Sequence, residues 1–189
     1  WHFLANNYCD SNGVNILTAH LFMQPKNGET LEEPEGERPI RIGNADMIYT
    51  DTIPPQIQYT ALGHLHGFMN IGSEENPIVY ASSPLSYSFS EAGQQKYVVV
   101  VEVAPDQRPS FEKIPLTQGK PLERKSFDNV PHTLEWLRDN PNTWVELTLE
   151  LKEYLKAQER KQLYSTHEGI VFLIPKMSWE LGKSPSGEL

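Results

Sequence analysis

The apolar stretches of this chain are all short, and this limits the folds that it can adopt. The longest, YVVVVEV (97–103), has the length of one strand and carries Glu102, so no stretch of the sequence is long enough to cross a membrane as a helix. VNILTAHLF (14–22) and IQYTALGH (57–64) likewise predict buried strands. The unbroken run at 97–101 is typical of a strand covered on both faces of its sheet.

The strand over 97–103 is predicted to pair with the segment that follows it. KYVVVVEVAP (96–105) and SFEKIPL (110–116) flank the turn sequence PDQRP, which is typical of a hairpin connection. PIVYASSPLSYSF (77–89) begins as a strand and continues as a loop rich in serine and proline. We therefore expect the first part of the chain to be rich in β-structure.

The hydrophobic pattern changes after about residue 117. FDNVPHTLEWLRDNP (127–141) predicts a helix with Asp128 as N-cap and Pro131 in its first turn. TWVELTLEL (143–151) alternates as a half-buried strand does, and a helix over 152–165 and a strand over 169–175 follow. This alternation predicts a small β-α-β-α-β unit. We divide the chain into residues 1–117, residues 118–176 and a linker or tail over 177–189.

Composition narrows the possible environments and partners. The 189 residues carry a net charge of −9, which argues against indiscriminate nucleic-acid binding, and the acidic stretch 28–37 predicts a solvated loop. A single cysteine, Cys9, excludes an internal disulfide framework and favours a reducing compartment, with the cytoplasm as the default. The chain begins at Trp1, so we expect either a processed protein or a segment that begins inside a longer one.

Three histidines follow the predicted strands. His64 and His66 stand two positions apart, and on extended backbone their imidazoles point to the same side. His20 ends the strand over 14–22. A histidine in that position is also compatible with a purely structural role in the core. The pair is the better candidate for binding a metal ion.

The order of these motifs resembles a known family. ILTAHLF, ALGHLHG and YASSPLSYSFSEAGQQKYVVVVEV, together with GERPIRIGNADMI (36–48), are similar to the second half of the SbcD family of DNA repair nucleases, within the calcineurin-like metallophosphoesterases. The resemblance covers about residues 14–175. It implies an α+β fold: part of a metallophosphoesterase β-sandwich flanked by helices, followed by a small α+β capping domain.

The resemblance also implies a metal centre. His20 matches the family's strand-terminal histidine, and Gly63, His64 and His66 match its Gly-His-x-His motif. By that pattern His20 and His64 would bind one metal ion and His66 a second. Two Mn²⁺ ions are expected, with Mg²⁺ or another divalent cation as alternatives.

The chain departs from the family pattern in several places. The motifs Asp-x-His, Gly-Asp and Gly-Asn-His of the family's N-terminal half are not found, so the general-acid histidine is expected outside this segment. Asp10 and Asp51 are possible substitute ligands, although both are better explained as solvated loop residues. Gly67 stands where relatives often carry a basic residue, and Ser82 replaces the usual glycine.

As part of an SbcD-type subunit, the chain would act on DNA. The family hydrolyses phosphodiesters at double-strand ends and hairpins together with the SbcC ATPase, usually as a dimer of nuclease subunits, in the cytoplasm and without a membrane anchor. Expected DNA contacts are Ser83, Lys120, Arg124 and Lys125, although the three cations are better explained as a solvated basic turn. Alone, the segment is expected to be inactive.

Two other functions stay open. The chain can belong to a metallophosphoesterase that acts on small phosphoesters or nucleotides, against which the SbcD-like blocks and the appended capping unit argue. It can also be a non-catalytic binding or assembly module, which the missing motifs and the acidic charge favour for the isolated polypeptide. The persistence of all three family-matched histidines argues against the module.

Overall fold

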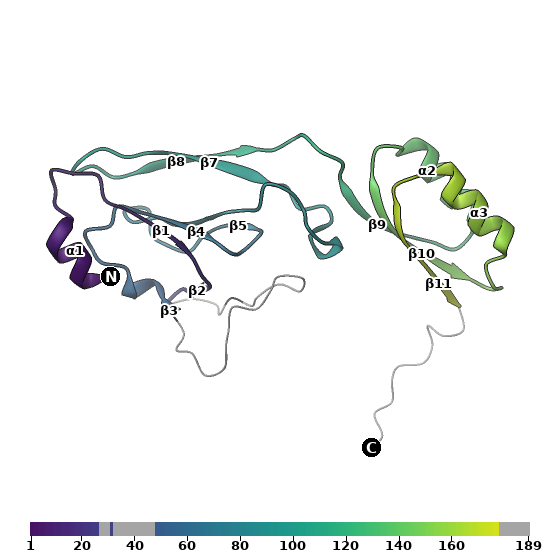
Figure 1. Cartoon of the computed structure of the whole chain (residues 1–189), viewed down its shortest axis with the longest axis horizontal. Coiled ribbons are helices and arrows are strands. Elements are labelled where there is room, and N and C mark those ends of the chain that lie inside the picture. Colours follow the sequence, from purple (N-terminus) through teal and green to yellow (C-terminus); the bar gives the residue numbers. More distant parts are fainter. Residues whose placement is uncertain (27–30, 32–47, 178–189) are drawn as a thin grey trace, which may run out of the picture. The chain divides into compact units, whose positions relative to one another are not determined.

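The computed structural model describes residues 1–26, 31 and 48–177, which form two compact units (Figure 1). The first unit contains residues 1–86 and 94–118, and the second contains residues 87–93 together with the chain from Gly119 onward. The acidic stretch 28–37 apart from Leu31, nearly all of the SbcD-like block 36–48 and the tail beyond residue 177 lie outside the described residues. Among the described helices, none is both long and apolar enough to cross a membrane.

The first unit is built mainly from short strands. Its elements are α1 (His2–Tyr8), β1 (Ile16–His20), β2 (Met23–Gln24), β3 (Ile48–Tyr49), the 3-10 helix η1 (Thr50–Thr52), β4 (Tyr59–Gly63), β5 (Phe68–Asn70), β6 (Ile78–Ala81), β7 (Tyr97–Glu102) and β8 (Ser110–Pro115). The main sheet has the order β1-β4-β6-β5, with β5 antiparallel to β6 and the other pairs parallel. Parallel pairing makes β1, β4 and β6 end at the same edge of the sheet.

The prediction that 14–22 forms a buried strand is wrong in one respect. The strand forms, but β1 lies at an edge of its sheet and its side chains alternate between half-buried and exposed, with Ile16 49% exposed. Burial in this unit is concentrated further along the chain. Its apolar core consists of Phe22, Met23, Leu62, Leu65, Ile78 and Tyr80.

The predicted hairpin is confirmed: β7 and β8 pair in antiparallel register. Its inner face packs on the main sheet, where Phe111 lies 6.2 Å from Tyr59 and 6.4 Å from Phe68 between ring centroids. The expectation that both faces of strand 97–101 are covered is wrong within the described residues. Val98 and Val100 are 43% and 48% exposed, because they point away from the main sheet.

The second unit alternates strands and helices, as the sequence pattern predicts. After the 3-10 helix η2 (Phe89–Glu91) come β9 (Leu122–Phe127), α2 (Val130–Asp139), β10 (Trp144–Leu151), α3 (Ala157–Thr166) and β11 (Ile170–Met177). The three strands are parallel in the order β11-β10-β9, and α2 contacts α3 beside the sheet (Figure 1).

Strand β10 forms the centre of this unit's core. Val145, Leu147 and Leu149 are fully buried, as their alternation predicts, and pack with Leu137 of α2 and Leu163 of α3. This arrangement is that of a sheet whose apolar face is covered by two helices.

Two helix boundaries differ from prediction. The N-cap of α2 is Asn129, whose side chain accepts a hydrogen bond from the His132 N–H at 2.9 Å, and Asp128 lies one residue earlier. Helix α3 begins at Ala157 instead of 152, and the Glu159 side chain at N3 accepts a hydrogen bond from the N–H of the N-cap residue Lys156 at 2.8 Å.

Candidate metal centre

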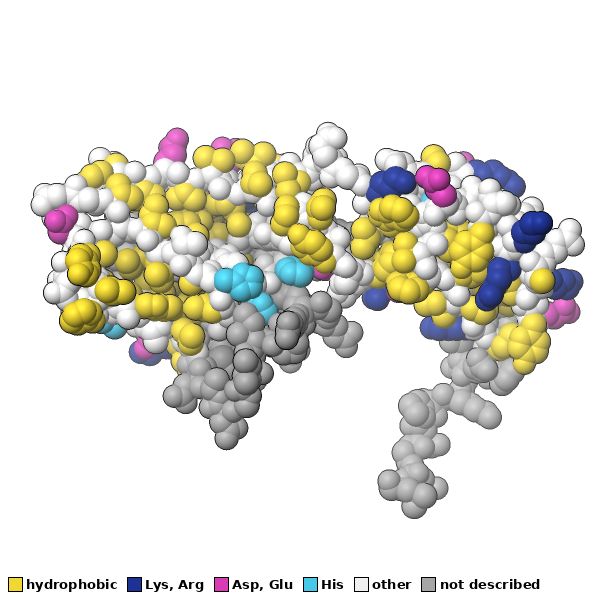
Figure 2. All heavy atoms as spheres, viewed as in Figure 1, with side chains coloured by type: hydrophobic (Ala, Val, Ile, Leu, Met, Phe, Trp, Pro, Cys, Tyr) yellow, Lys and Arg dark blue, Asp and Glu magenta, His cyan; other side chains and the backbone are white. Residues whose placement is uncertain are grey.

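The family-matched histidines lie where parallel strands of the first unit end. His20 is the last residue of β1 and pairs in register with Gly63, the last residue of β4, and His64 follows directly. Figure 2 shows histidine side chains gathered at one place on the visible face of this unit. The carboxyl ends of parallel strands are a common position for binding sites in α/β sheets.

His20 and His64 are neighbours in space. Their ring centroids are 5.7 Å apart and their planes are inclined by 69°. His64 is 8% exposed, and the Phe22 ring covers it at 6.0 Å between centroids. Glycine at position 63 allows this arrangement, because an ideal Cβ there would lie 2.8 Å from Nδ1 of His20.

The backbone at His64 has an unusual conformation. Its φ is 109°, in the left-handed region that β-carbon-bearing residues rarely adopt. Such conformations cost on the order of 1–3 kcal/mol and cluster at functional sites. The strained backbone therefore indicates a functional site at His64, and this indication is independent of the sequence motif.

The described residues do not form a complete metal shell. Among them, no three side chains of His, Cys, Asp or Glu are grouped closely enough to hold a metal ion. His20 and His64 are adjacent and fit as two nitrogen donors, whereas His66 lies two residues further, in the link between β4 and β5. The pair needs further ligands, carboxylates above all, to hold a divalent cation.

Asp10 and Asp51 do not supply those ligands. Asp10 precedes β1, and its carboxylate accepts the N–H groups of Asn12 and Gly13 at 2.9 and 3.0 Å. Asp51 forms an ion pair with Lys26 at 2.6 Å. Both are exposed, in agreement with the prediction that they are solvated loop residues.

Sequence reasoning missed a tyrosine that fixes the chain just after His20. The Tyr80 hydroxyl accepts a hydrogen bond from the Met23 N–H at 2.9 Å and donates one to the Leu21 carbonyl at 3.1 Å. Tyr80 is fully buried in β6, so the end of β1 is tied to the core. The sequence feature that could have revealed this contact is the tyrosine itself, because it stands within an apolar strand and a buried phenol needs a hydrogen-bonding partner.

The loop after β6 is also fixed. Ser82 has a φ of 79°, in the region that favours glycine, at the position where the resembled family usually carries one. Its hydroxyl accepts a hydrogen bond from the Tyr97 N–H at 2.9 Å. Ser83, an expected DNA contact, is buried at 6% exposure.

The structure does not bring the three predicted basic DNA contacts into one patch. Successive side chains of a strand point to opposite faces, so Arg124 and Lys125 of β9 face away from each other. Each cation is paired with an acid: Lys120 with Glu168 at 3.6 Å, Arg124 with Glu146 at 2.8 Å and Lys125 with Glu123 at 3.2 Å. Lys120 also lies 4.6 Å from the centroid of the Trp144 ring, and Lys125 lies 5.5 Å from that of Trp136.

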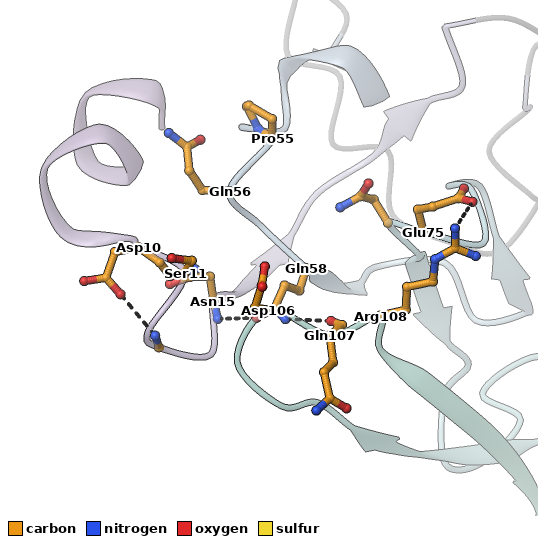
Figure 3. Close-up of a pocket in the computed structure, with 12 residues that line it drawn as sticks. Asp10, Ser11, Asn15, Pro55, Gln56, Gln58, Glu75, Asp106, Gln107 and Arg108 are labelled. Atoms are coloured by element: carbon orange, nitrogen blue, oxygen red, sulfur yellow. Dashed lines mark hydrogen bonds and ion pairs between the residues drawn. The ribbon is translucent and has the colours of Figure 1, made fainter.

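A cavity of about 400 Å³, lined mostly by residues of polar type, lies at the other end of the first unit's sheet, before β1 and β4 begin (Figure 3). The groups that line it are largely bonded to the protein. Gln58 donates to the carbonyls of Ala104 and Gln107, each at 2.8 Å, and Arg108 pairs with Glu75 at 3.1 Å. We interpret this cavity as structural.

Comparison with known proteins identifies the family. No family model matches the chain. The chain is 30% identical over 168 residues to the SbcD subunit of nuclease SbcCD from Bacillus subtilis strain 168, an alignment that covers 87% of this chain and 42% of that subunit. It is 33% identical over 129 residues to the SbcD subunits from Escherichia coli K12 and O157:H7, covering 66% of this chain and 32% of each of them. The chain belongs, over the aligned stretch, to the SbcD family.

The expected family is therefore confirmed, and the α+β class agrees with the described elements. The SbcD-like chain spans less than half the length of the curated relatives that it matches. The metallophosphoesterase sandwich, the domain boundaries at 117 and 176 and the roles of individual site residues stay predictions.

Proposed function

We propose that this chain is part of an SbcD-type nuclease subunit that hydrolyses DNA phosphodiesters with the help of divalent cations. The observation that carries the proposal is the contact between His20 and His64, whose rings lie 5.7 Å apart at the end of two parallel strands. Two motifs separated in the sequence thus supply adjacent imidazoles in a chain related to SbcD nuclease subunits.

In this proposal the chain supplies nitrogen ligands to a centre with two cations. His20 and His64 would bind one ion and His66 the other, with the remaining ligands and the general acid outside the described residues. The ions would be Mn²⁺, or Mg²⁺ or another divalent cation, and bound ions of this kind activate water and stabilise charge on a phosphoryl group. The chain alone would then be inactive.

The proposed partners follow from the same relationship. The relatives are named as SbcD subunits of the SbcCD nuclease. We propose an SbcC-type ATPase as partner, DNA ends and hairpins as substrates, a dimer of nuclease subunits and a cytoplasmic location. Among the proposed DNA contacts of the second unit, Arg124 is the most accessible, with 56% of its side chain exposed, compared with 31% for Lys120 and 38% for Lys125.

One observation favours a second candidate substrate. The chain has a net charge of −9, and Lys120, Arg124 and Lys125 each contact a carboxylate, which suits a small phosphoester better than a polyanion. To separate the two candidates, the full-length subunit is assayed on a small chromogenic phosphodiester and on a DNA duplex, and the two hydrolysis rates are compared.

The test of the proposed centre uses single substitutions in the full-length subunit. His64→Ala and His66→Ala are expected to abolish Mn²⁺-dependent cleavage of duplex DNA without loss of the fold, because each removes a ligand. His2→Ala, at an exposed position in α1, serves as the control and should cleave normally. Nearly normal cleavage by either of the first two variants would contradict the assignment.

A further inference from the structure

A buried lysine lies beside the candidate centre and is not among its predicted ligands. Lys96, immediately before β7, is 6% exposed. Its ammonium group donates to the carbonyl oxygen of His66 at 3.0 Å and to Oε1 of Gln94 at 3.1 Å. Lysine is almost never so deeply buried unless its charge is paired or hydrogen-bonded, so these hydrogen bonds are part of what allows Lys96 to be buried here.

The His66 carbonyl accepts a second hydrogen bond. The Ser83 N–H donates to it at 3.1 Å. Ser83 is itself 6% exposed, and its hydroxyl donates to the Leu85 carbonyl at 2.7 Å. Two donors from different segments, one after β6 and one before β7, therefore converge on the same peptide group.

The lysine is presented from a fixed part of the fold. Its own carbonyl accepts the Leu116 N–H at 2.8 Å, next to the end of β8, and Nε2 of Gln95 at 2.9 Å. The hairpin thus holds the backbone of Lys96, and the side chain extends from there to His66.

The segment that carries His66 needs such support. It is the short link 64–67 between β4 and β5, which contains the strained His64. Beyond it, an ideal Cβ on Gly67 would meet no atom within 4 Å, so the link is open to solvent there. The two hydrogen bonds to the His66 carbonyl fix the middle of this link.

We propose that Lys96 and Ser83 are positioning residues for His66. They hold its peptide group, and through it the imidazole, in one place before any metal ion binds. The proposal rests on the function proposed above, in which His66 is a ligand, and it adds residues that contact the ligand's backbone and not the ion. Groups that orient ligands in this way affect metal affinity without contacting the metal.

The first test uses the metal-free 189-residue chain. Lys96→Met keeps most of the unbranched side chain and removes the donor, and ¹⁵N relaxation then reports the backbone order of His66 and Gly67. We expect their order parameters to fall from about 0.85, typical of rigid backbone, to below about 0.6. Lys26→Met is the matched control, because Lys26 is in the same unit and pairs with Asp51 at the surface, and it should leave these values unchanged.

The second test measures Mn²⁺ affinity in the full-length subunit by calorimetry. Lys96→Met should weaken binding about 10- to 100-fold, the range found for groups that orient metal ligands. Lys96→Arg, which keeps a cationic donor, should recover most of the affinity, whereas a purely space-filling role for Lys96 would favour Met over Arg.

The outcomes separate the two proposals. Unchanged order at His66 in folded Lys96→Met overturns the positioning role. If that variant does not fold, hydrogen exchange of the Ser83 amide in the unmodified chain decides instead, since exchange as fast as in an unstructured peptide excludes the contact. Absence of Mn²⁺ binding by the unmodified subunit refutes the proposed function, while the metal-free measurement still decides the role of Lys96.

Discussion

An ideal Cβ atom on Gly63 would lie 2.8 Å from Nδ1 of His20, closer than real Cβ atoms approach a neighbour. The two residues are register partners on β1 and β4, so the absence of a side chain at position 63 makes room for the His20 imidazole. Glycine in the Gly-His-x-His motif therefore has a steric role toward a histidine on the neighbouring strand.

We predict that Gly63→Ala displaces the His20 ring. His20 is exposed and its ring can rotate away, so the free energy of unfolding should change by less than about 1 kcal/mol, below the usual cost of overpacking a core. The ring signals of His20 in NMR spectra should shift, and Mn²⁺-dependent cleavage by the full-length subunit should fall at least about tenfold, as expected when a ligand is displaced. Gly67→Ala is the matched control and should leave both unchanged, because nothing lies within 4 Å of its Cβ position.

The backbone of His64 leads to a second prediction. Its φ of 109° strains any residue that has a Cβ atom, whereas glycine adopts it freely. His64→Ala and His64→Gly both remove the imidazole and its packing on Phe22. We expect the glycine variant to be the more stable by about 1 kcal/mol in urea unfolding. Equal stability, or a more stable alanine variant, would show that the chain relaxes out of this conformation.

The third prediction concerns alkaline pH. Burial raises the pKa of the Tyr59 phenol, because it disfavours the charged phenolate. Above the ordinary tyrosine pKa of about 10, the unfolded chain therefore loses this proton more readily than the folded chain, and the free energy of unfolding should fall as pH rises. In Tyr59→Phe the decline above about pH 10 should be shallower, whereas Tyr8→Phe, at an 81% exposed position, should follow the unmodified chain. Identical slopes for Tyr59→Phe and the unmodified chain would exclude a contribution from this phenol.

The fourth prediction tests which residue caps α2. Asn129 accepts the His132 N–H, so Asn129→Ala should lower the stability of the second unit by about 1 kcal/mol. Asp128 contacts only the Asn129 side chain among the hydrogen bonds of the described residues, at 2.7 Å, and Asp128→Ala should cost clearly less. Thermal unfolding of the two variants checks the order, and a larger loss for Asp128→Ala would restore the assignment made from the sequence.

The fold could be predicted where hydrophobic alternation is strong. Val145, Leu147 and Leu149 show the period of a strand, and the structure buries all three. The first strand of the predicted β-α-β-α-β unit was given no residue range, because LERKSF (β9) places charged side chains on both faces and is typical of a basic turn. Its pairing with β10 overrides that local signal, since tertiary contacts decide strands more than propensity does.

The candidate centre could be predicted only in part. The contact of His20 with His64 follows from two motifs that end neighbouring parallel strands. The support for His66 could not be found in this way, because Lys96 is 30 residues away in the sequence and looks like an ordinary charged residue before a strand. The inward direction of the Lys96 side chain, toward the His66 carbonyl, becomes visible only once the hairpin is packed on the sheet.

The order of strands in the two units has a consequence for how the chain folds. In the second unit neighbouring strands are also successive in sequence, and the side-chain hydrogen bond of Ser126 to Glu150 between β9 and β10 closes a loop of only 24 residues. In the first unit β1 pairs with β4, and the hydrogen bond of Asn15 to Gln58 beside them joins residues 43 positions apart. Because closing longer loops costs more entropy and slows folding, we expect the second unit to acquire its structure earlier than the sheet that carries the histidines.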